Sequence, residues 1–256
     1  MNILLTNDDG FDSLFLVMLS EAAAARGHRV RVCAPHDQQS GKSQSISMGP
    51  LRVHPREMPG AELAVSVEGT PADCAAVGIK RLCGKPELVI SGMNNGYNAG
   101  FATFLSGTVG AARMASFSDI PALAVSVAYN TREETARFFA DWAVRLGERL
   151  PELPLPPHAL VSINCPDLPP RELKEAVMCP LSESPYEDGY DETVGPDGVR
   201  ALTLGHYSES EAQAPGSDLA MLADGHITLT VLTPGRVFGA DAFGLPNACP
   251  KSAETT

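Results

Sequence analysis

Short apolar runs alternate with longer amphipathic segments over the first two thirds of the chain, and this alternation constrains the fold more than any other feature. Runs of strand length lie at 2–6, 29–34, 63–67, 87–91, 121–127 and 159–164. Segments with helical spacing lie between them, at 13–26, 70–82, 106–117 and 131–149. Strands separated by helices indicate a parallel sheet covered on both faces, so we predict an α/β fold whose ligands bind beyond the carboxyl ends of the strands.

Local signals predict where two of the helices begin. Thr70 is a good capping residue, Pro71 fits the first helical position, and the acidic side chain of Asp73 favours the positive end of a helix. Thr131, followed three residues later by Glu134, predicts a capping box for the helix that runs through residue 149.

The pattern changes after the proline-rich stretch 151–157 and the pair Pro169-Pro170. Isolated strand-like runs follow in an acidic context, at 175–179, 199–204 and 226–232. A segment this polar cannot bury a core of its own, so its apolar faces should pack on a second subunit. We therefore predict a core of residues 1–170 and a β-rich C-terminal extension of residues 171–256 that takes part in oligomerisation.

Composition argues against several functional classes. The formal net charge of −12, from 19 Lys and Arg against 31 Asp and Glu, opposes binding to a nucleic-acid backbone or an anionic membrane. Two carboxylates precede any apolar run long enough for a signal peptide, and no apolar stretch approaches the roughly 20 residues of a membrane span. Six dispersed cysteines without a C-x-x-C motif predict neither disulfides nor a thiolate metal site. We expect a cytoplasmic protein without double-stranded nucleic acid or membrane as partner.

The sequence N-D-D-G at 7–10 directly follows the first predicted strand. Two adjacent carboxylates at the binding edge of a sheet repel each other unless they share a cation, so Asp8 and Asp9 predict a site for a divalent metal. An Asx turn in which Gly10 supplies a positive φ is the structural alternative. Aspartyl-phosphate enzymes place a nucleophilic Asp here as well, but they space the second one as D-x-D.

Three further polar segments also follow predicted strands or begin a helix. The S-G-K-S sequence at 40–43 is not a phosphate loop, because His36 stands where the first glycine is needed and no helix follows. Ser40 is instead a candidate oxygen ligand or hydrogen-bond donor. The Gly/Asn-rich stretch 92–100 predicts a loop that offers amide groups to a metal or a phosphate. Ser106 is a candidate N-cap, and the helix terminus that it begins predicts an anion site.

These motifs closely resemble those of the SurE family, whose members are metal-dependent nucleotidases and acid phosphatases. The matching pieces are NILLTNDDG, CAPHDQQSGKSQSIS, GTPADC, SGMNNGYNAG, SGTVGAA, SINCP and GSDLAMLADGHITLTVLTP. The resemblance implies a Rossmann-like core, a C-terminal arm exchanged between subunits, and homodimers or homotetramers. It also implies one divalent cation per subunit, Mg²⁺, Mn²⁺ or similar, held by Asp8, Asp9, Ser40 and Asn94. Phosphate contacts are implied for Asn98, Ser106, Gly107 and Thr108.

We therefore expect a hydrolase that cleaves phosphate monoesters, with nucleoside 5′- or 3′-monophosphates as substrates. Water is the expected nucleophile, activated by the metal or by Asp8 or Asp9 as general base. Two alternatives stay open at this point. One is an aspartyl-phosphate type of phosphatase, and the other is a non-catalytic module that binds metal or nucleotide.

Overall fold

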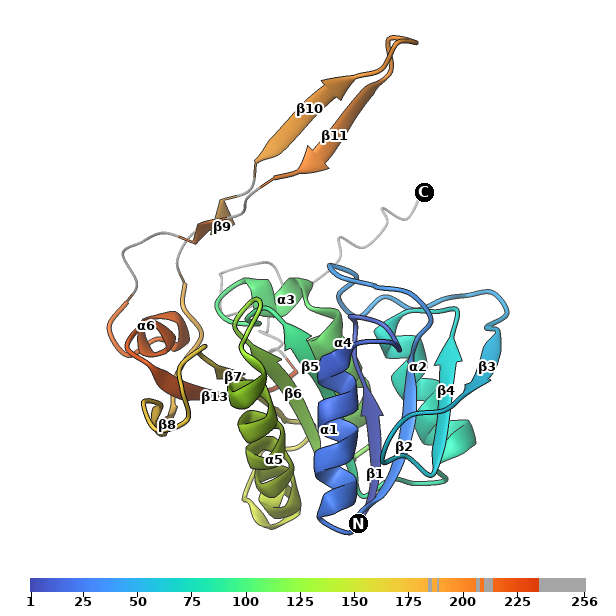
Figure 1. The fold of residues 1–256 in the computed structure, drawn as a ribbon, viewed down its shortest axis with the longest axis vertical. Helices are drawn as coiled ribbons and strands as arrows, with labels where there is room; N and C mark the ends of the chain where they lie inside the picture. Colours follow the sequence, from blue (N-terminus) through green and yellow to red (C-terminus); the bar gives the residue numbers. More distant parts are fainter. Residues whose placement is uncertain (184–185, 188, 206–207, 210–213, 235–256) are drawn as a thin grey trace, which may run out of the picture.

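A computed structural model describes residues 1–183, 186–187, 189–205, 208–209 and 214–234 (Figure 1). Five of the six cysteines lie within these ranges as free, buried thiols, whereas Cys249 lies outside them. Within the same ranges, no helix combines the length and the apolar character that crossing a membrane requires.

A nine-stranded mixed sheet forms the centre of the molecule, in the order β3-β4-β2-β1-β5-β6-β7-β13-β8. The strands from β4 to β7 in this order run parallel, as predicted. β3 is antiparallel to β4, β13 is antiparallel to β7, and β8 is parallel to β13 at the far edge. The strands span β1 Asn2–Thr6, β2 Arg29–Pro35, β3 Val53–Arg56, β4 Leu63–Val67, β5 Leu88–Asn95, β6 Ala122–Val127, β7 Leu160–Cys165, β8 Lys174–Met178 and β13 His226–Leu232.

Helices cover both faces of the sheet (Figure 1). Buried residues of α1 and α5 form one core cluster with strand residues such as Ile3 and Leu5, and those of α2 and α4 form another that includes Leu4. Successive side chains of β1 therefore enter opposite cores, which explains its unbroken apolar sequence. The helical segments span α1 Leu14–Ala25, α2 Pro71–Val77, η1 Gly78–Leu82, α3 Ala102–Leu105, α4 Gly107–Ser116, α5 Glu133–Arg149, η2 Leu150–Glu152 and α6 Asp218–Ala223.

The predicted start of α2 is confirmed. The Thr70 hydroxyl accepts the N–H of Asp73 at 3.1 Å, and the Asp73 carboxylate accepts the N–H of Thr70 at 3.0 Å. Pro71 occupies the first helical position, where its missing N–H costs nothing. Asp73 also accepts the hydroxyl of Ser47 at 2.7 Å, so the cap holds the loop after β2 against α2.

The predicted start of α5 is wrong. The N-cap of α5 is Arg132, and no capping box forms between Thr131 and Glu134. The Thr131 hydroxyl donates to a backbone carbonyl of the preceding turn at 2.7 Å. The N–H of Arg132 donates instead to the carboxylate of Asp167, 3.0 Å away, at the end of β7. A tertiary acceptor thus replaces the local one that the sequence suggested.

β5 is longer than predicted, and residues 92–95 belong to the strand rather than to a loop. The pairing with β6 shifts register between Ser91 and Asn94, which marks a bulge. Gly92 has φ +141°, and a Cβ on it would lie 2.2 Å from the carbonyl oxygen of Val125. The glycine that suggested a loop is therefore needed where two strand backbones approach closely.

The C-terminal region contributes to two different parts of the structure. β8 and β13 pair into the main sheet, whereas the hairpin of β10, Tyr190–Val194, and β11, Arg200–Leu204, projects away from it (Figure 1). Both hairpin strands are exposed along their whole length. A second small ladder pairs β9, Tyr186–Glu187, with β12, Ser208–Glu209.

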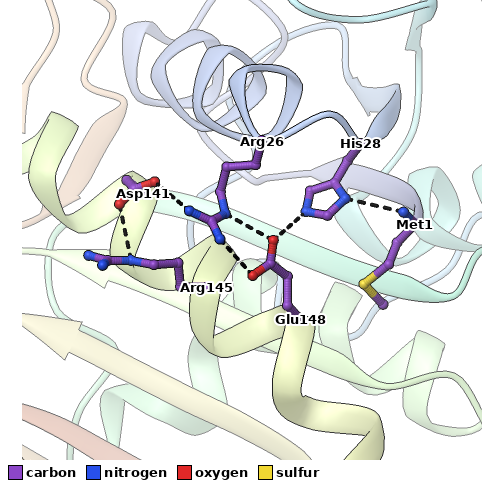
Figure 2. A network of polar contacts seen from close by, with 6 residues as sticks. All are labelled: Met1, Arg26, His28, Asp141, Arg145 and Glu148. Carbon is purple, nitrogen blue, oxygen red and sulfur yellow. Dashed lines mark hydrogen bonds and ion pairs between the residues drawn. The ribbon is translucent and has the colours of Figure 1, made fainter.

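A polar network joins α1 to α5 at the end of the sheet opposite the carboxyl ends of the parallel strands (Figure 2). Glu148 accepts hydrogen bonds from Arg26 and His28, each at 2.8 Å. The other ring nitrogen of His28 lies 3.2 Å from the amino group of Met1. The hydrogen bond from Arg26 is the main reason why the pKa of Glu148 lies below its usual value.

Replacing Glu148 with Gln is expected to lower the melting temperature at pH 7 by a few degrees. Because the pKa of Glu148 is lower in the folded chain than in the unfolded one, its contribution is present above the unfolded value and is lost as the pH falls through the folded value. Thermal melts from pH 7 down to pH 3.5 should therefore show the difference from wild type shrinking below about pH 4.5. Glu152→Gln, at an exposed carboxylate of η2, is the control; a pH-independent difference for Glu148→Gln would contradict the assignment.

Candidate metal and phosphate site

The candidate residues lie where the order of the parallel strands reverses. β1 is followed by β2 on one side of the sheet, whereas β4 is followed through α2 by β5 on the other side of β1. In open α/β sheets such a switch point creates a crevice outside the carboxyl ends of the strands. Asp8 and Asp9 follow β1 after one residue, and Asn94 and Asn95 end the adjacent β5.

Asp8 is buried against the first turn of α4. Its side chain accepts a hydrogen bond from the Thr108 hydroxyl. A Cβ on Gly107 would lie 2.9 Å from the Cβ of Asp8, so glycine is required for this approach of helix and turn. Burial, with a further contribution from the charge of Asp9, raises the pKa of Asp8 to about 6 although the Thr108 bond opposes the shift.

Asp9 lies closer to the surface and bonds to the end of β5. Its carboxylate accepts the backbone N–H of Asn95 at 3.0 Å, and burial raises its pKa above the ordinary value. Among the described residues, no basic side chain contributes to the pKa of either Asp8 or Asp9. Two neighbouring carboxylates without a cationic partner fit a divalent metal ion, which would supply the missing charge.

Further ligands for such an ion have to be neutral oxygens. Within the part of the chain that the structure describes, no group of three or more His, Cys, Asp or Glu side chains could hold a metal. The loop after β2 reaches the site, because the N–H of Gln39 donates to the carbonyl of Asp8 at 2.7 Å. Ser40 follows directly; it is exposed, and its hydroxyl oxygen accepts a bond from Gln38 at 3.1 Å.

Asn94 and Asn98 have different surroundings. The amide nitrogen of Asn94 donates to the carbonyl of Gly96 at 2.7 Å, which leaves its side-chain oxygen for other partners. Asn98 is buried, and its amide nitrogen donates to the hydroxyl of Ser126 at 2.8 Å. The backbone N–H of Asn98 donates to Asn164, also at 2.8 Å. The structure thus ties Asn98 to β6 and β7, and its contact with phosphate stays a prediction.

The N-terminus of α4 lies against Asp8. The Ser106 hydroxyl accepts the N–H of Val109 at 3.0 Å, so Ser106 is the N-cap as predicted. Its oxygen is used in the cap, and the Thr108 hydroxyl is used by Asp8. The backbone N–H of Thr108 also bonds to the Asp8 carboxylate, so the N–H of Gly107 is the group of the first turn that remains for an anion.

Asp218 supports the site from the C-terminal region, a role that the sequence analysis did not assign. Its buried carboxylate accepts the N–H of Gly100 at 2.8 Å and that of Ser182 at 2.7 Å. Ser217 caps α6, so Asp218 occupies its first position. The adjacent Ser217 and Asp218 are a cap signal that could have predicted α6, but the partner at residue 100 is too far away in sequence to be predicted.

Comparisons with known proteins, by family model, by sequence and by structure, all point to the same family. A family model described as "Survival protein SurE" matches residues 3–188. A protein named 5′-nucleotidase SurE from Desulfovibrio desulfuricans is 37% identical, covering 91% of this chain and 92% of its own. One of the same name from Maridesulfovibrio salexigens is 35% identical with the same coverage. The crystal structure of the SurE protein from Aquifex aeolicus matches with a TM-score of 0.76 and 27% identity, covering 91% of this chain and 93% of that one.

Proposed function

The chain belongs to the SurE family, and from that premise we propose that it is a divalent-metal-dependent phosphomonoesterase acting on nucleoside 5′- or 3′-monophosphates. One observation carries this proposal. Two adjacent carboxylates, Asp8 and Asp9, lie at the switch point of the sheet without a basic partner among the described residues, and Asp8 packs against the N-terminus of α4. The carboxylates suit a cation, and the helix terminus beside them suits a phosphate.

We propose that Asp8, Asp9, Ser40 and Asn94 hold one cation per subunit, Mg²⁺ or Mn²⁺ or similar. The phosphate would lie against the N-terminus of α4 (Ser106, Gly107 and Thr108), with Asn98 near it. Ser40 and Asn94 would complete the ligand set with neutral oxygens. The bonds from Thr108 to Asp8 and from Asn95 to Asp9 hold the two carboxylates in place.

The proposed reaction is hydrolysis by water. When bound, the cation polarises the phosphoryl oxygens and neutralises their charge. The N-terminus of α4, with the N–H of Gly107, stabilises the charge that develops on the oxygens of the transferred group. Asp8 or Asp9 accepts the proton of the attacking water as the new P–O bond forms and the ester bond breaks. The leaving oxygen then takes up a proton to give the nucleoside.

Neither alternative from the sequence is favoured. The D-D spacing differs from that of aspartyl-phosphate enzymes, and a carboxylate that binds a cation is a weak covalent nucleophile. The named relatives are nucleotidases, which argues against a non-catalytic module. We further propose that the enzyme works in the cytoplasm, where nucleoside monophosphates are produced.

A phosphate-release panel tests the function directly. The protein is treated with chelator and assayed with nucleotides, polyphosphate and sugar phosphates, with Mg²⁺, Mn²⁺ or Co²⁺ added back. We expect activity to disappear on chelation and to return with a divalent cation, with nucleoside monophosphates among the substrates, because Asp8 and Asp9 without metal repel the phosphate. Full activity in metal-free protein, or no release under any condition, would overturn the proposal.

We also propose that residues 171–256 form an extension by which the protein assembles into homodimers or homotetramers. The exposed β10–β11 hairpin carries large apolar side chains, among them Tyr190, Val194 and Leu202. A second apolar surface lies around the exposed rings of Phe104 and Phe117. Apolar surfaces of this kind are typical of subunit contacts.

A further inference from the structure

A cleft opens beside Asp9, and its described lining includes neither Asp8 nor residues of α4. It has a volume of about 770 Å³, within the range of small-ligand sites, and Asp9 and Asn95 line one end of it. Asp8, by contrast, lies against Thr108 and Gly107 of α4. A phosphate monoester held beside the carboxylate pair at the N-terminus of α4 can therefore extend its leaving group past Asp9 into this cleft.

One wall of the cleft suits a nucleoside. The first two turns of α1 and the turn before it contribute apolar side chains, among them Phe11, Leu14 and Phe15. Leu14 is 74% exposed, and a large apolar side chain left exposed in a cleft beside a catalytic site is a typical ligand contact. The opposite rim is polar, with amide groups from Gln38 and Asn130.

Among the described residues that line the cleft, the charged side chains are acidic. They are the four carboxylates of Asp9, Asp12, Asp37 and Glu133, and this part of the lining includes no Lys or Arg. Asp12 is paired with Arg56 at 2.5 Å, and Glu133 is paired with Arg137 at 2.7 Å. Those two charges are therefore largely neutralised.

Asp37 differs from these paired carboxylates. It is exposed, and among the described residues it takes part in no ion pair. Its position beside the catalytic turn is fixed: a Cβ on Gly10, whose φ is +97°, would lie 3.3 Å from the carbonyl carbon of Asp37. With Asp9 balanced by a bound cation, Asp37 is, within the described part of the chain, the unpaired negative charge of the cleft that an incoming leaving group meets.

We propose that Asp37 determines substrate specificity by rejecting leaving groups that carry a second phosphate, so that the enzyme selects monophosphates of uncharged nucleosides. This inference rests on the proposed function and adds to it the charge of the leaving group. Like charges that approach within the cleft repel, and because Asp37 is exposed the repulsion is screened by solvent and modest. An uncharged nucleoside meets no such repulsion.

A matched pair of substrates tests this inference. Deoxyadenosine 5′-monophosphate is compared with deoxyadenosine 3′,5′-bisphosphate, in which the leaving group carries the other phosphate whichever ester is cleaved. We expect Asp37→Asn to raise kcat/KM for the bisphosphate relative to the monophosphate roughly 3- to 10-fold, and Asp37→Lys to raise it further. The gain should shrink in 0.5 M salt, because added ions screen an exposed charge.

Glu152→Gln removes the same charge from an exposed position on η2 and should leave the ratio unchanged. If the wild type cleaves the monophosphate but Asp37→Asn and Asp37→Lys leave the ratio of the two substrates at its wild-type value, the role of Asp37 is wrong and the proposed function stands. If the wild type releases phosphate from neither substrate with any divalent cation, the proposed function fails, and this inference fails with it.

Discussion

Replacing Asp9 with Asn is expected to lower turnover at least ~100-fold while the protein remains folded. The variant keeps an oxygen that can accept the N–H of Asn95, now 3.0 Å from the carboxylate, so the local structure has no reason to change. It loses one of the two negative charges that compensate the cation, and both metal affinity and catalysis should fall.

Asp9→Asn should affect the stability of the metal-free protein and the stabilisation by added metal differently. Burial raises the pKa of Asp9 in the folded chain, so the ionised side chain lowers the stability of the metal-free protein at pH 7. This cost disappears as the pH falls through the folded pKa, and it is absent in Asp9→Asn. Melting curves should therefore show a metal-free variant at least as stable as wild type, but with a smaller rise in melting temperature when Mn²⁺ is added.

The two proposed neutral ligands, Asn94 and Ser40, provide the comparison for this variant. Asn94→Ala and Ser40→Ala should weaken metal binding less than Asp9→Asn, since their oxygens contribute geometry without charge. Titration calorimetry with Mn²⁺ and initial rates on one nucleotide measure both effects. Near-wild-type turnover of Asp9→Asn with unchanged metal affinity would show that the D-D pair is only a turn.

The sequence predicted the elements whose signals are local. The α2 capping box involves Thr70 and Asp73, three residues apart, and β1 is an apolar run whose residues enter both cores. The predicted start of α5 failed because its first N–H groups are satisfied partly by Asp167, which is 35 residues away from Arg132. Local patterns cannot reveal a distant acceptor that replaces a nearby one.

In the candidate site, too, local features could be predicted from the sequence and long-range contacts could not. Asp8 and Asp9 could be proposed as metal ligands because adjacent carboxylates after a strand are costly without a cation, and that assignment stays a prediction. The length of β5 was underestimated because Gly92 is typical of loops, whereas the structure uses it at a bulge against Val125. Asp218 was missed because its function depends on a contact with Gly100 across 118 residues of sequence.

Deleting every residue after Pro170 is expected to give an aggregated or unstable protein without activity. The deletion removes β13, which pairs with β7 over the five residues from Leu160 to Asn164. β7 is buried throughout, so the deletion would expose both its apolar faces and a row of unpaired backbone groups. Size-exclusion chromatography and phosphate release measure the result; a soluble, monomeric and fully active truncated chain would show that the extension is dispensable.

Since the truncated chain loses several things at once, Asp218→Ala separates the support of the site from the loss of β13. The substitution leaves the N–H groups of Gly100 and Ser182 without their buried acceptor, at a cost on the order of 2–4 kcal/mol. We expect melting ~5–10 °C lower and turnover reduced about 10-fold, because Gly100 ends the segment that begins with Asn94. Asp224→Ala, at an exposed carboxylate that pairs with Lys174 at the end of α6, is the matched control and should change neither quantity much. Equal effects of the two substitutions would mean that Asp218 only stabilises α6, and the C-terminal region would then act on the site through β13 alone.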